Sequence, residues 1–163
     1  MHRLQARSLI KQLAVAAALV GLASSASANH AWGSYHWART ANPFTLKLGD
    51  NVSGPWDAAL ASASTDWSTW PATLAPVLNT QIVAGDANPK NCRATAGRGE
   101  VCNSKYGNNG WLGIAQIWAS GTHITQGVVK LNDTYFNTST YNTSPWRNLV
   151  TCQEVGHIFG LGH

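Results

Sequence analysis

The feature that most constrains this chain is its C-terminal run QEVGHIFGLGH, from Gln153 to His163. In an α-helix, residues four positions apart share a face, so Gln153 and His157 lie together with Glu154 beside them. Gly160 predicts that the helix stops in a left-handed cap, because glycine adopts this conformation without a steric penalty. The turn at Gly160 would bring His163 back toward His157. We therefore expect two imidazoles and a carboxylate to converge at the end of this helix.

The spacing resembles the His-Glu-x-x-His-x-x-Gly-x-x-His motif of the metzincin zinc endopeptidases, in particular a matrixin-like member. Glu154, His157, Gly160 and His163 stand at the motif's positions, and Gln153 replaces the first histidine. The resemblance implies that Glu154 is the catalytic base and that His157 and His163 bind Zn²⁺. It places Gln153 at the third ligand position. The implied function is a zinc-dependent endopeptidase that hydrolyses peptide bonds of a protein or peptide substrate.

Gln153 alters this expectation, because an amide oxygen is a harder and poorer donor for zinc than an imidazole nitrogen. Three outcomes are open. Gln153 ligates through its oxygen, or water or another side chain fills its position, or the site is empty and the protein is a pseudoprotease. We expect metal binding to survive with reduced affinity.

The N-terminus has the composition of a secretory signal peptide. Three basic residues among the first eleven precede an apolar run at 13–23, which ends in Ala26-Ser27-Ala28. Basic, apolar and then small residues predict a signal peptide spanning 1–28, and the apolar run is too short to favour a membrane span. We therefore expect a secreted, extracellular protein with no membrane association after cleavage.

Residues 29–163 are expected to form one catalytic domain that behaves as a monomer. The formal net charge of +4 includes three Lys and Arg residues of the signal peptide. Eight basic and seven acidic residues then remain, a balance near +1 that argues against nucleic-acid binding.

The chain has three cysteines, which in an exported protein suggests disulfide bonding. Cys92 and Cys102 bracket a short glycine-containing loop and are expected to pair. Cys152, inside the motif helix, is left either as a buried free thiol or with a partner beyond the sequence.

Apolar periodicity predicts an α/β (α+β) fold, with a mixed twisted sheet, a covering helix and an active-site helix. The resemblance narrows this to a metzincin-like fold whose C-terminal subdomain, with its methionine turn, would follow His163. In the second helix, Trp146, Leu149 and Val150 share a face with Gln153 and predict a mostly buried helix. Strands are expected at 44–48, 77–84, 111–118 and 124–132, with helices from Pro55 and from Ser144-Pro145.

The segment 85–110 is predicted to be a long loop closed by the disulfide. Its oxygen-bearing side chains suggest a possible Ca²⁺ site, but without EF-hand-like spacing a solvated loop is the favoured interpretation. These side chains are Asp86, Asn88, Glu100 and Asn103.

By the resemblance, the strand at 111–118 would be the edge strand above the cleft, with Ile114 and Gln116 as substrate-binding residues. The following turn is expected at Ser120-Gly121. His123 is interpreted as an ordinary surface histidine rather than a metal ligand, and His30 and His36 are not predicted to be ligands.

A second class of function is a secreted binding module for carbohydrate or protein on the same fold without catalysis. Eight tryptophans motivate this alternative, because exposed indole rings stack on sugars and peptide side chains.

Overall fold

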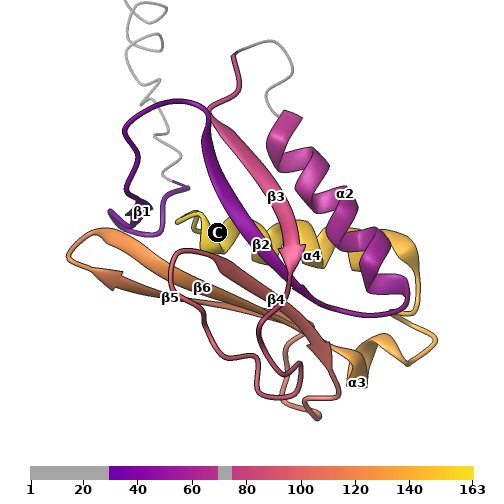
Figure 1. Cartoon of the computed structure of the whole chain (residues 1–163). Coiled ribbons are helices and arrows are strands. Elements are labelled where there is room, and N and C mark those ends of the chain that lie inside the picture. The colour runs from indigo at the N-terminus through magenta and orange to yellow at the C-terminus, as the bar shows by residue number, and fades with distance from the viewer. Residues whose placement is uncertain (1–29, 70–74) are drawn as a thin grey trace, which may run out of the picture.

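The computed structural model describes residues 30–69 and 75–163, and the predicted signal peptide lies outside them. The described residues form a mixed α/β domain with a six-stranded sheet and three helices (Figure 1). The strands follow the order β1-β6-β4-β2-β3, and β5 pairs with β6 outside this path. All pairings are parallel except that of β5 with β6. The strands are β1 (His36–Trp37), β2 (Phe44–Asn51), β3 (Leu78–Ala84), β4 (Gly99–Ser104), β5 (Gly113–Ser120) and β6 (His123–Asn132).

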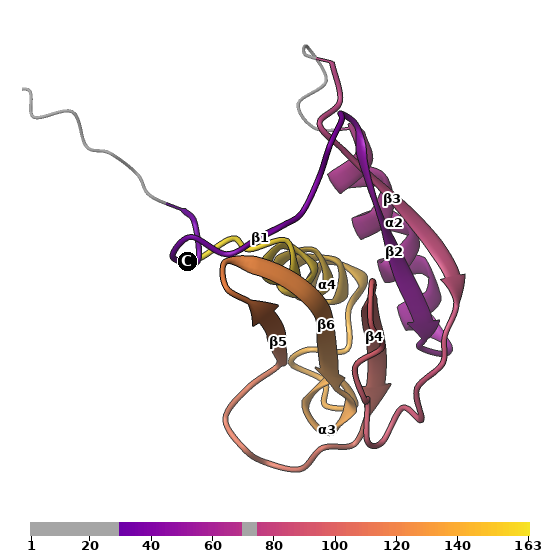
Figure 2. The ribbon, with the colours of Figure 1, turned by 60° about the vertical axis from the view of Figure 1, so that its left-hand side comes forward.

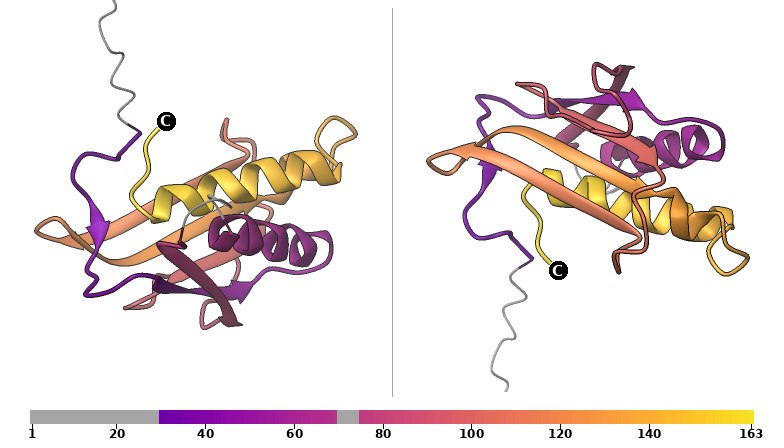
Figure 3. Two further views of the ribbon diagram at one scale, coloured as in Figure 1. Left: turned by 90° about the horizontal axis from the view of Figure 1, so that it is seen from above. Right: turned by 90° about the horizontal axis from the view of Figure 1, so that it is seen from below.

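Helices α2 (Pro55–Thr69) and α4 (Ser144–Ile158) lie side by side on one face of the sheet (Figure 3). The core lies between them and the strands, and includes Leu46 and Leu48 of β2 and Trp56 and Leu60 of α2. The strand at 44–48 and the helix from Pro55 are thus confirmed, as is the strand near 77–84. Among the described residues, no helix is long and apolar enough to span a bilayer.

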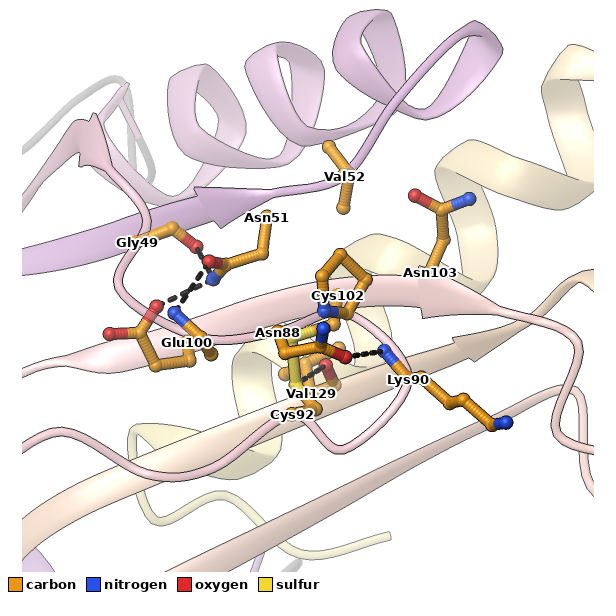
Figure 4. The surroundings of a disulfide bond; sticks show 12 residues. Gly49, Asn51, Val52, Asn88, Lys90, Cys92, Glu100, Cys102, Asn103 and Val129 are labelled. Carbon is orange, nitrogen blue, oxygen red and sulfur yellow. Dashed lines mark hydrogen bonds between the residues drawn. A yellow bond between two sulfur atoms is a disulfide. The ribbon is translucent and has the colours of Figure 1, made fainter.

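The prediction that residues 85–110 form a loop is wrong in one respect, because this segment contains the strand β4. This strand lies between β2 and β6, and its residues from Gly99 to Cys102 are buried. The expected disulfide joins Cys92 and Cys102, as Figure 4 shows. The loop is therefore tied to the middle of the sheet rather than left in solvent.

Glu100 of β4 is 0% exposed, yet its carboxylate is fully engaged. It accepts hydrogen bonds from Nε of Arg98 and Nδ2 of Asn51, both at 2.6 Å. Gly49 makes room for it, because a β-carbon there would lie 2.2 Å from the Oε2 atom. A buried carboxylate with these partners is part of the fold.

Two of the other residues suggested for Ca²⁺, Asn88 and Asn103, have partners of their own. The Oδ1 atom of Asn88 accepts from the amide of Lys90, and that of Asn103 accepts from the amide of Ser53. Asn103 also points away from Glu100 (Figure 4). The oxygens of Asn88 and Asn103 are thus held by different parts of the chain, whereas the carboxylates of Asp86 and Glu100 share Arg98 as an ion-pair partner.

The hairpin of β5 and β6 is confirmed, although its turn is formed by Gly121 and Thr122, because Ser120 pairs with His123. His123 is therefore the first residue of β6. β5 has β6 as its sole strand partner among the described residues, which confirms it as an edge strand.

Helix α4 starts at Ser144 as expected, but Thr143 rather than Ser144 is its N-cap, with Oγ1 accepting from the amide of Trp146. A short helix, α3 (Asp133–Phe136), lies between β6 and α4. Gly160 follows α4 with a φ of +98°, which confirms the predicted left-handed stop. A β-carbon at Gly160 would also lie 2.2 Å from the carbonyl oxygen of Tyr35. The position thus requires glycine for both conformation and space.

The N-terminal arm, residues 30–37, lies beside the C-terminal end of the chain (Figures 1 and 2). The amide of Trp32 donates to the carbonyl of Gly160, and Gly162 donates to the carbonyl of His30. Nε1 of Trp37 donates to the carbonyl of Ile158 at 2.8 Å. These bonds bring the arm next to the motif residues.

Candidate functional site

A cleft of about 720 Å³ opens between β5 and α4. One wall is formed by the start of β5 and the residues before it, and the other by the exposed side of α4. The N-terminal arm and the end of the chain close one end. The lining residues include Trp32, Trp111, Ile114, Trp146, Leu149 and the motif residues Gln153, Glu154, His157 and His163. The structure therefore brings together all four predicted motif side chains that carry donor atoms.

His157 is buried at 9% exposure and has one free ring nitrogen. Its Nδ1 lies 2.8 Å from the carbonyl oxygen of Leu161, and since a carbonyl can only accept, Nδ1 carries the proton. The Nε2 atom is then an acceptor, and it has no hydrogen-bond partner among the described residues. An unpaired buried acceptor costs about 1–3 kcal/mol, so this nitrogen is suited to a ligand.

His163 completes the expected convergence of two imidazoles. Its ring centroid lies 4.5 Å from that of His157, with an angle of 67° between the planes. The Nδ1 atom of His163 lies 3.5 Å from Nε2 of Gln153. Gln153 and His157 are on neighbouring turns of one helix, so three donor side chains border the same end of the cleft.

Glu154 is 8% exposed and lies against β5. A β-carbon at Gly113 would be 2.7 Å from its Cγ atom, so the close approach of strand and helix depends on that glycine. Burial raises the pKa of the Glu154 carboxyl, and the neighbouring His157 opposes this in part. A carboxyl with a raised pKa in a cleft has the properties of a proton-transfer group.

The two predicted substrate-binding residues separate in the structure. Ile114 is exposed on the edge strand and lines the cleft. Gln116 instead borders an adjacent hollow of about 520 Å³, together with Trp32 and Tyr35. Of the two, Ile114 is the residue that lines the cleft.

The face of α4 predicted to be buried is in part open. Val150 is buried, whereas Trp146 is exposed and Leu149 is 56% exposed, and both line the cleft. The helical periodicity correctly placed Trp146, Leu149 and Val150 on one face of α4. It could not show that β5 leaves part of this apolar face uncovered. The exposed part of this face, Trp146 and Leu149, therefore forms an apolar wall of the cleft that a ligand can reach.

Trp32 was missed as a site residue. Its ring meets that of His157 edge-on, with centroids 6.1 Å apart. The sequence signal was weak, because the aromatic residues of the arm have no periodicity and their contact is with a residue more than 100 positions away.

The donor set determines which metal the site could hold. Among residues 30–69 and 75–163, no group of three His, Cys, Asp or Glu side chains is arranged for a metal. Two imidazoles and the amide of Gln153 remain, and the free Nε2 of His157 is the atom that a metal would satisfy. Imidazole nitrogens suit zinc, so the residues fit Zn²⁺ with a weaker third ligand than histidine.

Cys152 is half-buried, and burial raises the pKa of its thiol. It has no disulfide partner in the part of the chain that the structure describes.

No protein-family model, curated protein or solved structure matches this chain.

Proposed function

We propose that this chain is a secreted zinc-dependent endopeptidase with a metzincin-like, matrixin-like catalytic fold. The observation that carries the proposal is the buried, unpaired Nε2 atom of His157, which lies with His163, Gln153 and Glu154 in one open cleft. A chance Glu-x-x-His sequence in a helix would not bring a third ligand group back from beyond the helix end. The signal-peptide pattern at 1–28 supports secretion.

The zinc ligands would be His157 through Nε2, His163 through a ring nitrogen and Gln153 through its amide oxygen. The Nδ1–H bond of His157 to the carbonyl of Leu161 orients the ring, as hydrogen bonds from metal-binding histidines commonly do. When bound, zinc would polarise the carbonyl of a peptide bond and lower the pKa of a water molecule.

Glu154 would transfer the protons. A carboxylate oxygen accepts a proton from the attacking water and then delivers it to the amine that leaves. Burial raises the pKa of this carboxyl and a bound zinc ion would lower it, so the two effects oppose each other at the group that accepts and releases the proton.

The edge strand β5 supports an extended peptide as substrate. Its outer edge has no strand partner among the described residues, so its backbone groups can pair with an added strand. Ile114 and the α4 side chains Trp146 and Leu149 supply apolar contacts on the two walls of the cleft.

Gln153 favours a second candidate, a pseudoprotease or a binding module for carbohydrate or protein. With only two imidazoles, the same aromatic-lined cleft could hold a ligand without hydrolysing it. Trp32, Trp111 and Trp146 line the cleft and would stack on such a ligand.

The test combines metal analysis with a peptide-cleavage assay on the secreted protein. We expect one zinc in the cleft and cleavage that a chelator abolishes. Glu154→Gln should retain zinc and reduce kcat by about 10²–10⁴-fold, and Asp57→Asn, an exposed acid on α2, should change neither.

Gln153→His separates the two candidates, with Gln81→His on β3 as the control. If the protein is an endopeptidase, the wild type already cleaves peptides, and Gln153→His should bind zinc more tightly than the wild type does. If the wild-type cleft takes no zinc and cleaves nothing, and Gln153→His restores both, the pseudoprotease interpretation is correct.

A further inference from the structure

Two exposed histidines meet where the N-terminal arm joins the sheet. His36 of β1 and His123 of β6 are direct partners in the parallel register. Their ring centroids lie 4.8 Å apart with 78° between the planes. The sequence did not suggest this pair, because the two residues are far apart along the chain.

Among the described residues, the ring of His36 has a hydrogen-bond partner at one of its two nitrogens. Its Nδ1 lies 2.8 Å from the carbonyl oxygen of Ser34, so Nδ1 donates and Nε2 is left as an acceptor. His157 has the same arrangement in the cleft. A backbone carbonyl that fixes one nitrogen of a histidine is a common support for metal ligation by the other.

The spacing of the rings fits coordination of one ion. A metal lies about 2.1 Å from each imidazole nitrogen, which places the centroids of two ligating rings about 5 Å apart. The 4.8 Å of this pair agrees with that value, as does the 4.5 Å between His157 and His163.

The surroundings select the class of ion. The hollow that contains His36 and His123 is also lined by Arg39 and by no carboxylate. Ca²⁺ and Mg²⁺ require oxygen ligands, whereas Zn²⁺ and Cu²⁺ accept neutral imidazoles. Because both histidines are exposed, such an ion can reach them, and water can occupy its remaining positions.

We propose that His36 and His123 bind a second divalent transition-metal ion, of the zinc or copper class, which fastens the N-terminal arm to β6. The strand β1 has only two residues, so few backbone bonds hold it. The same arm carries Trp32, whose ring contacts His157. Metal bound at this pair therefore stabilises one end of the cleft without entering it.

Zinc counting after equilibrium dialysis tests the proposal. His36→Gln and His123→Gln should each bind one zinc fewer than the wild type. His30→Gln, an exposed histidine on the same arm, should bind the same number as the wild type. His163→Ala removes a ligand of the cleft and leaves the second site intact. The proposal is overturned if both His36→Gln and His123→Gln bind as many zinc ions as the wild type.

The zinc counts test the His36–His123 site whether or not the cleft binds zinc. If the cleft takes no zinc, the wild type binds one ion and the His36 and His123 variants bind none, and the second site still stands. If the cleft alone binds zinc, His163→Ala loses the ion and the other variants keep it.

Hydrogen exchange gives a second readout that does not depend on counting. At a free zinc concentration about ten times the dissociation constant, opening of the arm should become about tenfold rarer. The amides of Trp32 and His36 report this, because they bond to the carbonyls of Gly160 and Thr122. We expect zinc to slow their exchange in His163→Ala and to have no effect in His163→Ala/His123→Gln. Equal exchange with and without zinc in His163→Ala would contradict the proposal.

Discussion

Gly113 of β5 and Glu154 of α4 touch across the cleft, and a β-carbon at position 113 would lie 2.7 Å from the Cγ atom of Glu154. The same β-carbon would be 2.7 Å from Cγ1 of Val150. The edge strand and the helix therefore approach to a distance that only glycine permits. This approach places the carboxylate beside the strand along which we propose that a peptide binds.

Gly113→Ala is expected to push Glu154 out of position. A misplacement of about 1 Å in a proton-transfer group costs about 10²-fold in rate, so kcat should fall by roughly that factor. Zinc content should stay at the wild-type level, because His157 and His163 are untouched. Ser120→Ala, at the far end of β5, is the control in the same peptide-cleavage assay. Full activity of Gly113→Ala would show that this contact does not position Glu154.

Asn132→Ala is expected to destabilise the wall of the cleft. Asn132 is 0% exposed, and its amide bonds to the chain around Gly107, Asn109 and Trp111, which leads into β5. Loss of these bonds leaves buried groups unpaired, so the free energy of unfolding should fall by about 2–3 kcal/mol. Urea unfolding measures the change, with the exposed Asn79→Ala as control. A loss no larger than that of the control would contradict this role.

Removal of the disulfide should weaken the fold at β4. In the chain-entropy model, a bridge closing a loop of this length contributes about 3 kcal/mol. We expect Cys92→Ala/Cys102→Ala to lose about that free energy of unfolding, measured by denaturant titration. An unchanged midpoint would mean that β4 is held by its neighbours alone.

The raised pKa of Tyr106 leads us to expect that the free energy of unfolding falls at high pH. Its pKa is raised to about 12, first by burial and then by the charge of Asp133, and its hydroxyl donates to the carbonyl of Pro89. Because the folded pKa exceeds the ordinary value of 10.0, the contribution of the neutral phenol is complete below pH 10.0 and is lost as pH rises toward 12. Tyr106→Phe should therefore be less stable than wild type at neutral pH, by about 1 kcal/mol, and similar to it near pH 12.

Ultraviolet titration of the phenols checks the same assignment. The wild type should show a phenolate transition near pH 12 that is missing from Tyr106→Phe. If the two titration curves coincide above pH 10.0, the assignment is wrong.

The fold was predictable where the periodicity is local. Leu46 and Leu48 alternate with polar residues in β2, and Trp56, Ala59, Leu60 and Ala63 repeat with helical spacing in α2. These patterns depend only on burial of one face, which neighbouring residues determine. Both elements were therefore located from the sequence to within a few residues.

β4 was missed because its signal is not local. Its buried residues include Glu100, a type that is rarely buried without a partner. Arg98 is the one local partner of Glu100, whereas the partner Asn51 lies on β2 and the space comes from Gly49, so most of what permits burial is distant in the sequence. A glycine-rich and asparagine-rich setting then made the strand resemble a loop.

Some features of the candidate site were likewise predictable from the local sequence, and others were not. The convergence of His157 and His163 follows from helix periodicity and the glycine stop, both of which are local. The contributions of Trp32 and Gly113 depend on the docking of the arm and the edge strand against α4. The pairing of His36 with His123 likewise depends on sheet register, which the sequence around either histidine does not encode.

Anomalous diffraction at the zinc edge from crystals of the zinc-loaded protein tests the central claim most directly. We expect a peak about 2.1 Å from Nε2 of His157, with His163 and the amide oxygen of Gln153 as further ligands. A fully zinc-saturated crystal with no peak in the cleft, and with Nε2 of His157 bonded to another protein group, would contradict it.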